Sequence, residues 1–420
     1  MKKVVKFGGS SLASAEQFKK VGNIIRKEES RRYVIPSAPG KRTPDDTKVT
    51  DMLYSCYGQA ILGEDAERDF EEQLEAIKER YNSIIRGLNL DLSLDEEFKT
   101  IRTNFSKKIG RDYAASRGEY LNGIIMAAYL GYEFIDAAEV IVFDENGNFD
   151  GDETHKILSE RLENTERAVI PGFYGAKPDG SIQTFSRGGS DITGSIVAKA
   201  VHADMYENWT DVSGFLIADP RIIKNPKPID VITYRELREL SYMGATVLHE
   251  DAIFPVRKEG IPINIRNTNA PEDKGTLIVE DTCRKPRFTI TGIAGKKDFA
   301  SITIEKAMMN SEVGFCRKVL EVFENNNISI EHMPSGIDTM TIFVHRDEFE
   351  EKGFKIDLYK VATVVLAFLL IVTWVYFLFF KSNSVDKTEL IQTNEQVNTV
   401  PQEQEEKPVE ITKIEDLNPK

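Results

Sequence analysis

Cysteine and histidine are scarce in this chain of 420 residues, which contains three cysteines and five histidines. Cys56, Cys283 and Cys316 are odd in number and widely spaced, which excludes a disulfide framework and a CxxC metal site. The histidines lack the spacing of metal ligands, so no protein-bound metal is expected. This pattern is typical of a protein from a reducing compartment.

Positive charge is also in deficit, since 54 Lys and Arg residues face 68 Asp and Glu residues, for a formal net charge of −14. Sequence-independent nucleic-acid binding requires basic surface to neutralise phosphates, so the composition excludes it. No N-terminal signal peptide is evident, and we expect the main part of the chain to be cytoplasmic. Its length suggests two or three domains.

A glycine pair follows an apolar, strand-like run at the N-terminus. The motif Lys6-Phe7-Gly8-Gly9-Ser10-Ser11 precedes a helical stretch over 15–29, with Ser11 or Ser14 as the N-cap. Glycine backbone N–H groups, the positive end of a helix dipole and Lys6 together favour an anion such as phosphate. Neither GxxxxGK[ST] nor GxGxxG is present, so a simple tight turn remains an alternative.

A second glycine motif repeats this arrangement at 187–191, where Arg187-Gly188-Gly189-Ser190-Asp191 precedes a helical run. An arginine can hold a carboxylate or phosphate in a bidentate way, and a helix dipole keeps an acidic residue ionised in the first turn. A polar loop over 208–221 could contact a base and a ribose. The alternatives are that Asp191 only caps a helix and that Trp209 belongs to the core.

Taken in order, these motifs resemble those of the aspartokinases. The resemblance covers residues 1–350 and includes KFGGSS at 6–11, SRGE at 116–119, RGGSD at 187–191, WTDVSG and ADPR over 209–221, GATVLH at 244–249 and IPINIRNT at 261–268. It implies an amino-acid kinase fold over residues 1–281, a three-layer α/β/α sandwich. It also implies transfer of phosphate from ATP, with Mg²⁺ bound to the ATP, to the side-chain carboxylate of L-aspartate, as the first step of lysine, threonine and methionine synthesis.

The resemblance also implies roles for individual residues. Two positions depart from the common pattern: Thr246 stands where many aspartokinases have lysine, and Leu216 where some have tyrosine. Glu119 could instead be a solvated charge on a helix. The implied catalytic residues are Lys6, Arg187 and Asp191; the ATP and phosphate site comprises Lys6, Phe7, Gly8, Gly9, Ser10, Thr210, Asp211, Leu216, Arg221, Thr246 and Val247; the aspartate site comprises Ser37, Thr50, Glu119, Arg187, Gly188, Gly189 and Ser190.

Two further regions flank or follow this core. Residues 63–111 show helical spacing of apolar residues, which predicts an α-helical insertion; in the family this region helps to form a substrate lid. Residues 285–352 show a strand, helix, strand, strand order, with strand-like runs over 288–293 and 300–304, a helix over 313–325 and strands over 328–331 and 340–344. This order resembles a partial, α+β ACT domain whose second repeat is missing.

ACT domains of aspartokinases bind an end-product amino acid between paired domains. The resemblance therefore implies a homodimer and an amino-acid effector, with lysine preferred and threonine next. A plain loop at 334–336 is the alternative. The implied effector residues are Asn310, Gly314, Phe315, Pro334 and Ser335.

An unbroken apolar run of twenty residues, from Val361 to Phe380, lies beyond the ACT-like region. This length matches the ~20 residues that a helix needs to cross a bilayer, so we expect one transmembrane helix that anchors a cytoplasmic catalytic region. A buried core helix is the alternative. Residues 381–420 are polar and acidic, which is typical of a disordered tail. If the tail is a fusion, the enzyme would be soluble and cytoplasmic.

Two other functions stay open. The chain could be another amino-acid kinase family enzyme, acting on glutamate, acetylglutamate or carbamate. It could also be a membrane-tethered amino-acid sensor without turnover.

Overall fold

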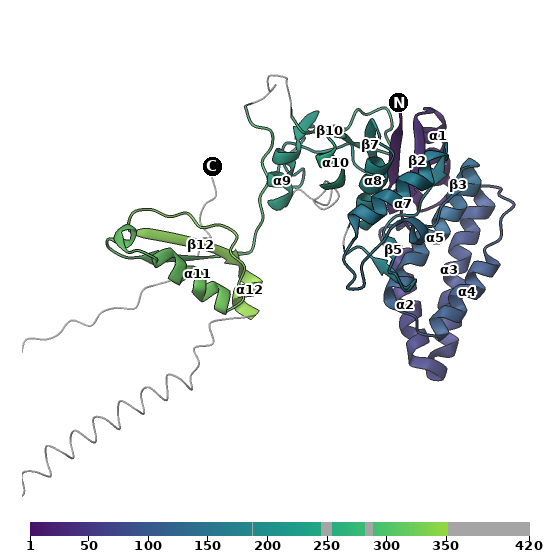
Figure 1. Ribbon diagram of the computed structural model, residues 1–420, viewed down its shortest axis with the longest axis horizontal. Coiled ribbons are helices and arrows are strands. Elements are labelled where there is room, and N and C mark those ends of the chain that lie inside the picture. Colours follow the sequence, from purple (N-terminus) through teal and green to yellow (C-terminus); the bar gives the residue numbers. More distant parts are fainter. Residues whose placement is uncertain (187, 245–253, 282–288, 352–420) are drawn as a thin grey trace, which may run out of the picture. The chain divides into compact units, whose positions relative to one another are not determined.

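The computed structural model describes residues 1–186, 188–244, 254–281 and 289–351. The chain divides into two compact units, Met1–Lys297 and Asp298–Lys420, and each is described by itself (Figure 1). The division lies after Lys297, whereas the sequence predicts that the kinase region ends at residue 281 and that the ACT-like region begins at residue 285.

One eight-stranded sheet forms the centre of the first unit. Its strands lie in the order β3-β4-β2-β1-β7-β9-β10-β8, and neighbouring strands are parallel except for the antiparallel pair β9 and β10. A separate hairpin is formed by β5 and β6. The strands are β1 (Lys3–Phe7), β2 (Arg31–Pro36), β3 (Glu133–Phe134), β4 (Ala168–Val169), β5 (Tyr174–Ala176), β6 (Ile182–Thr184), β7 (Met205–Thr210), β8 (Val231–Thr233), β9 (Ile263–Asn267) and β10 (Thr276–Val279).

Helices cover both faces of this sheet, because the side chains of a strand alternate between its two faces. In β1, Val5 and Phe7 pack into the hydrophobic cluster on one face, and Val4 packs into the cluster on the other. The helices that contribute to the first cluster are α1 (Ala15–Arg26), α2 (Val49–Leu62), α3 (Glu67–Gly87), α4 (Asp95–Ser106) and α5 (Arg111–Leu130). Those on the second are α6 (Ala137–Val140), α7 (Gly151–Glu163), α8 (Gly189–Ala200), α9 (Tyr234–Tyr242) and α10 (Phe254–Lys258).

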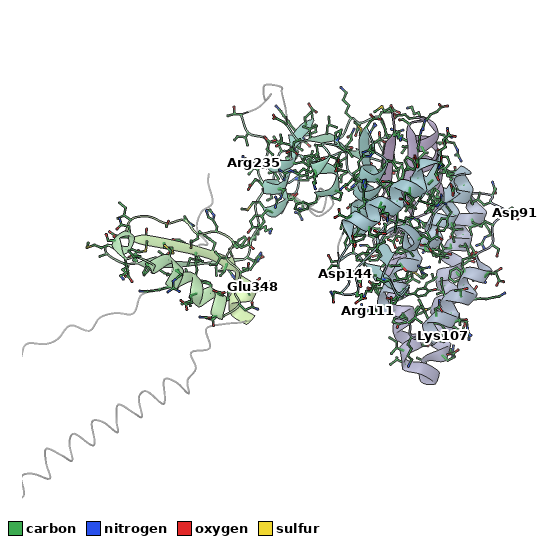
Figure 2. All side chains as sticks on the ribbon, in the orientation of Figure 1. Asp91, Lys107, Arg111, Asp144, Arg235 and Glu348 are labelled. Carbon is green, nitrogen blue, oxygen red and sulfur yellow. The ribbon has the colours of Figure 1, made fainter. Side chains whose placement is uncertain are left out.

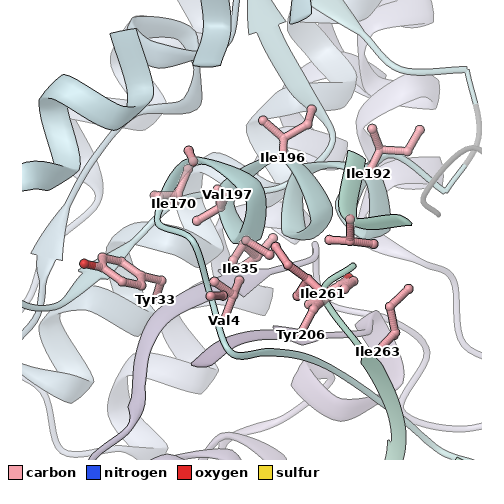
Figure 3. Packing of buried hydrophobic residues seen from close by; sticks show 14 of the residues in the cluster. Val4, Tyr33, Ile35, Ile170, Ile192, Ile196, Val197, Tyr206, Ile261 and Ile263 are labelled. Atoms are coloured by element: carbon pink, nitrogen blue, oxygen red, sulfur yellow. The ribbon is translucent and has the colours of Figure 1, made fainter. Parts of the chain in front are cut away.

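Figure 3 shows the second cluster from close by. Val4, Ile35 and Tyr206 from the central strands lie beneath Ile192, Ile196 and Val197 of α8, and all of these side chains are buried. The predicted three-layer α/β/α arrangement is therefore observed. The packing places α8 directly over the central strands β1 and β7.

The predicted helical insertion over 63–111 is also observed. It consists mainly of α3 and α4, which pack beside α2 and α5 through residues such as Phe70, Ile77 and Phe105. Its outer surface is charged and exposed, as Asp91 and Lys107 illustrate (Figure 2). Several of these exposed charges pair with one another, as Arg68 does with Glu72 at 2.8 Å.

In its described part, residues 298–351, the second unit contains a two-stranded antiparallel sheet packed against the helix α11 (Phe315–Asn325). Met340, Ile342 and Phe323 form its small core with neighbours from both strands. Its elements are β11 (Phe299–Glu305), the 3₁₀ helix η4 (Met309–Ser311), α11 (Phe315–Asn325), β12 (Thr339–His345) and α12 (Arg346–Glu351).

The strand predicted over 300–304 is observed as part of β11, but two other strands predicted for residues 285–352 are wrong. Residues 289–293 form no strand, and the Ile293 N–H instead donates to the Ile217 carbonyl of the first unit at 2.7 Å. Residues 328–331 are also not a strand; the chain there pairs with β12 through an isolated bridge between His332 and Phe343. The observed order is therefore strand, helix, strand, and the ACT-like assignment stays a prediction.

The predicted membrane segment from Val361 to Phe380 and the tail over 381–420 lie outside the described residues. Among the residues that are described, no helix is long and apolar enough to cross a bilayer.

A buried ionic network holds the centre of the sheet on the α1 face. Glu207 of β7 is fully buried and accepts hydrogen bonds from Lys3 Nζ at 2.9 Å, Arg31 Nε at 2.8 Å and Trp209 Nε1 at 2.9 Å. Glu28 pairs with Lys3 at 2.6 Å. Burial alone would raise the pKa of Glu207, but the hydrogen bond from Arg31 and the charges of Arg31 and Lys3 outweigh it and lower the pKa. The carboxylate is therefore ionised and fully satisfied.

We expect Glu207→Gln to destabilise the first unit by about 3 kcal/mol, because Lys3 and Arg31 would share a buried site without their main counter-charge. Denaturant unfolding followed by far-UV circular dichroism measures this change. Glu272→Gln is the matched control, since the Glu272 side chain is 80% exposed where it pairs with Lys27. Equal unfolding midpoints for the two variants would show that the network contributes nothing.

Candidate active site

The carboxyl ends of four neighbouring strands meet at one edge of the sheet, where α/β folds commonly bind ligands. Gly8 follows β1, residues 37–40 follow β2, Thr210 ends β7 and Thr268 follows β9. Ser11 Oγ lies 2.7 Å from Thr268 Oγ1, which ties the β1 turn to the end of β9. Segments far apart in sequence thus form one edge.

A buried lysine and a carboxylate meet beside this edge. Lys6 Nζ lies 2.6 Å from Asp191 Oδ1 and 3.4 Å from Asn208 Oδ1, and Asn208 Nδ2 donates to Asp191 Oδ1 at 2.8 Å. Lys6 is 8% exposed. Asp191 lies in the first turn of α8, where the helix dipole stabilises a negative charge. Its side chain binds Lys6 and Asn208, so it does more than cap a helix.

Sequence reasoning missed Asn208 as a site residue. Asn208 lies directly beside Lys6 in the parallel register of β1 and β7. Two polar residues that lie opposite each other on the same face of neighbouring buried strands indicate a functional site. Reading that signal requires the strand pairing, which one sequence alone does not provide.

The glycines after β1 allow two backbone segments to approach closely. The Gly40 N–H donates to the Gly9 carbonyl at 2.8 Å, and a Cβ on Gly40 would lie 2.6 Å from the Gly9 carbonyl carbon. Ser10 is exposed in the 3₁₀ helix η1 (Gly9–Leu12). The Phe7 ring stacks on Trp209 in the core, so only the backbone of Phe7 is available to the site.

Glu119 of α5 is buried at 6% exposure, so it is not the solvated helix charge that the alternative proposed. Its Oε2 atom has no hydrogen-bond partner among the described residues. Burial raises the pKa of Glu119 to about 7, although backbone hydrogen bonds and the charges of Arg117 and Lys6 oppose the shift. An unpartnered buried carboxylate oxygen is costly, and it is suited to a cationic ligand.

The other predicted aspartate-site residues surround Glu119 or begin α8. A Cβ on Gly118 would lie 3.8 Å from Thr50 Oγ1, which places Thr50 beside the Glu119 turn of α5. The Ser37 carbonyl accepts a hydrogen bond from Asn122 Nδ2 of α5 at 2.7 Å. At the start of α8, Gly188 is the N-cap with φ +60°, and Gly189 and Ser190 are buried. Arg187 lies outside the described residues.

The predicted nucleotide loop is more open. Thr210 is half-buried, and its Oγ1 donates to Asp211 Oδ1 at 3.2 Å. Leu216 is 38% exposed and pairs with Pro228 through a β-bridge. Arg221 is exposed and pairs locally with Asp219 at 2.6 Å. Thr246 and Val247 lie outside the described residues.

In the second unit the two predicted effector segments lie side by side. The Asn310 N–H donates to the Ile337 carbonyl at 3.3 Å, two residues after Ser335, which forms a β-bridge with Met340. The Pro334 carbonyl accepts from the Thr341 N–H at 2.9 Å. Gly314 is the N-cap of α11 with φ +81°, and Phe315 is the first residue of the helix.

A cavity of about 780 Å³ lies elsewhere, between α7, α8 and α10. His155, Ile196, Phe254 and Arg257 are among its lining residues, and none of the predicted site residues lines it. The candidate site at the strand ends is therefore separate from this cavity.

Comparison with known proteins agrees with this fold and these motifs. The family model described as "Amino acid kinase family" matches residues 1–267. The chain belongs to the amino acid kinase family. Aspartokinase 3 from Bacillus subtilis (strain 168) is 40% identical over 370 residues, which cover 83% of this chain and 79% of that protein.

Two solved structures extend the similarity within this family. Aspartate kinase from Clostridium acetobutylicum is 53% identical, with a TM-score of 0.76 over 86% of this chain and 82% of that one. E. coli aspartokinase III, crystallised with aspartate and ADP, is 23% identical and shares the fold, with a TM-score of 0.65 over 82% of this chain and 79% of that one. The motif resemblance to aspartokinases is thereby confirmed.

We expect Gly40→Ala to destabilise the protein by about 1–3 kcal/mol, because the added methyl group would overlap the Gly9 backbone. Gly58→Ala is the matched control: Gly58 lies inside α2, and nothing lies within 4 Å of an added Cβ. Alanine there should stabilise the helix by about 0.5–1 kcal/mol. Thermal unfolding of both variants tests the close contact between the Gly9 and Gly40 backbones. A melting temperature of Gly40→Ala equal to or above that of the wild type would refute it.

Proposed function

We propose that this chain is an aspartate kinase, which transfers the γ-phosphoryl group of ATP to the side-chain carboxylate of L-aspartate and forms 4-phospho-L-aspartate and ADP. The observation that carries the proposal is that a cation, Lys6, and a carboxylate without a partner, Glu119, lie in the same site. An ion-paired lysine, Lys6, lies beside the first turn of α8, and the unpartnered carboxylate of Glu119 lies close enough to respond to the Lys6 charge. Similarity to aspartokinases over most of the chain supports the choice of substrate.

On the phosphate side, Lys6 acts on the transferring group. Phosphoryl transfer requires little covalent work from a protein, so positioning and charge stabilisation supply most of the rate. Asp191 and Asn208 hold the Lys6 ammonium in place, so it is oriented before the nucleotide binds. The Gly9 backbone and the first turn of α8 provide N–H groups suited to phosphate oxygens. The Gly8 N–H donates to the Trp209 carbonyl at 3.0 Å, so Gly8 contributes its lack of a side chain next to Lys6 Nζ.

On the aspartate side, Glu119 accepts the α-ammonium group of the substrate. That contact would satisfy the buried Oε2 atom. Thr50 and Ser190 supply hydroxyl donors, and Arg187 is suited to a substrate carboxylate. We assign Ser37 to the same side through its position at the end of β2.

Magnesium enters this proposal with ATP and not as a resident metal. Among the described residues, no three potential metal-ligating side chains cluster together. A magnesium ion bound to ATP would neutralise charge on the phosphates during transfer. The protein's own contribution is the cation of Lys6 and the helix N-terminus.

Regulation and anchoring form a second part of the proposal. Resemblance to ACT domains favours an amino-acid effector, lysine first, that binds near Asn310 and Pro334 in a homodimer. The apolar run from Val361 to Phe380 favours a single membrane anchor, with the catalytic unit in the cytoplasm. The alternatives are a kinase for glutamate or acetylglutamate and a tethered sensor without turnover.

The full-length chain, solubilised in detergent, should consume Mg-ATP with aspartate and not with glutamate or acetylglutamate, and hydroxylamine should trap the acyl phosphate as a hydroxamate. Lys6→Met should lower turnover on the order of 10²–10³-fold, because one preorganised cation is lost from the transition state. Lys27→Met is the control, since the Lys27 side chain is 69% exposed.

Other outcomes would change the assignment. Turnover with glutamate alone would replace the substrate, and no turnover from folded, ATP-binding protein would favour the sensor. Unchanged turnover in Lys6→Met would remove Lys6 from the mechanism. In the same preparation, inhibition by lysine tests the effector, and sedimentation of activity with membranes before detergent is added tests the anchor.

The rate constant kcat/KM for aspartate should fall as pH decreases through about 7, because the free enzyme then protonates Glu119 and loses the anion that binds the substrate ammonium. This dependence should be absent in Glu119→Gln, whose kcat/KM should be low at every pH. Initial rates at saturating ATP measure it. A wild-type profile that is flat from about pH 6 to 8 would contradict the role of Glu119.

A further inference from the structure

Arg117 is a buried cation whose main contacts are aromatic rings. It lies on α5 at 6% exposure, two residues before Glu119. Its guanidinium carbon lies 4.6 Å from the ring centroid of Tyr113, 4.3 Å from that of Tyr120 and 5.4 Å from that of Tyr174. Ser116 Oγ accepts hydrogen bonds from Arg117 Nε and Nη2 at 3.1 and 3.0 Å. No carboxylate of the described residues forms an ion pair with it.

A buried charge without a counter-charge is strongly unfavourable, so another interaction must stabilise the Arg117 guanidinium. The faces of aromatic rings carry negative charge and attract a desolvated guanidinium. Two of the three rings, Tyr113 and Tyr120, belong to α5 itself. The third, Tyr174, belongs to β5, so this contact joins α5 to a different element.

Tyr174 in turn is part of the hairpin that leads to the second glycine motif. Its hydroxyl donates to Asp136 Oδ1 at 2.6 Å. On the other strand of the hairpin, Thr184 Oγ1 and Gln183 Nε2 both donate to Asp112 of α5 at 3.0 Å. Helix α5 therefore holds the β5–β6 hairpin at two points, through Asp112 and through Arg117.

The chain that leaves this hairpin reaches α8 within a few residues. β6 ends at Thr184, and Gly188 is the N-cap of α8. The Phe173 N–H donates to Thr193 Oγ1 at 3.0 Å, which ties the start of the hairpin to α8 as well. The hairpin thus connects the helix that carries Glu119 with the helix that carries Ser190 and Asp191.

We propose that Arg117 is a positioning residue, which holds Tyr174 against α5 and thereby sets the geometry between Glu119 and the first turn of α8, where aspartate binds. This inference rests on the proposed function, because it assumes that α5 and α8 contact different groups of one aspartate molecule. It predicts that loss of Arg117 affects aspartate binding more than ATP binding. On the phosphate side, Lys6 and Asn208 are neighbours on β1 and β7, and Gly8 follows β1, so the sheet holds these groups without the hairpin. Only Asp191 and the first turn of α8 are shared with the aspartate side.

Steady-state kinetics of the full-length protein test the inference. Arg117→Met should raise the KM for aspartate about tenfold or more and leave the KM for ATP within about twofold. Arg117→Lys keeps the charge and loses the planar stacking, so its aspartate KM should lie between those of the wild type and Arg117→Met. Hydrogen exchange at the amides of residues 174–184 should be faster in Arg117→Met.

Arg111→Met is the matched control. Arg111 lies on the same helix and also stacks on a tyrosine, with its guanidinium 4.7 Å from the Tyr54 ring centroid, but it is exposed (Figure 2). Its loss should change neither KM nor exchange in the hairpin. Tyr174→Leu should reproduce the effect of Arg117→Met, and the double variant should show less than the sum of the two effects, because both disrupt one contact.

The outcomes separate this inference from the proposed function. If the wild type does not phosphorylate aspartate, the proposed function fails first. If the wild type is active and Arg117→Met keeps a normal aspartate KM, the positioning role is wrong. If Arg117→Met does not fold, Arg117→Lys decides: a raised aspartate KM with normal melting supports the role, and equal rises in both KM values overturn it.

Discussion

The ion pair between Lys6 and Asp191 constrains the rest of the catalytic unit. A lysine on the central strand of a buried sheet is tolerated only when a counter-charge meets it within the protein. Asp191 provides that charge from the first turn of α8, and the helix dipole stabilises its ionised form. The pair therefore requires α8 to begin directly above β1. Gly188 at positive φ begins the helix there, and Ile196 and Val197 hold it against the sheet.

Charged residues of β1 and β7 have different roles on the two faces of the sheet. On one face they stabilise the fold, and on the other they form part of the candidate site. On the α1 face, Lys3 and Arg31 satisfy Glu207, and the Trp209 indole adds a hydrogen bond. On the α8 face, Lys6 is held by Asp191 and Asn208. What distinguishes the site is Glu119, whose Oε2 atom has no partner in the described part of the chain. A fully satisfied network rigidifies a core, and a partly satisfied one is suited to a ligand.

Sequence reasoning predicted the features that depend on local pattern. The glycine motif after β1 and the first helix, with Ser14 accepting from the Gln17 N–H at its N-cap, both follow from spacing and capping rules. The strand predicted over 288–293 failed because alternating apolar residues indicate a strand only where a partner strand exists. Here the described residues contact α9 and its surroundings, with Thr291 bonded to Glu236 and Ile293 to Ile217. Asn208 required the register of β7 against β1, which is tertiary information.

Arg117 and Glu119 are opposite charges only two residues apart in the sequence, but the geometry of the helix keeps them from forming an ion pair. Residues two apart on an α-helix point roughly 200° apart, so their side chains lie on opposite faces. Arg117 therefore reaches the tyrosines, and Glu119 faces the segment after β2, where Ala38 is in contact with α5. If the two did pair, Glu119 would be satisfied internally and would have no capacity left for a substrate ammonium group. By directing the cation to aromatic rings, helix α5 joins the hairpin on one face and keeps a carboxylate available on the other.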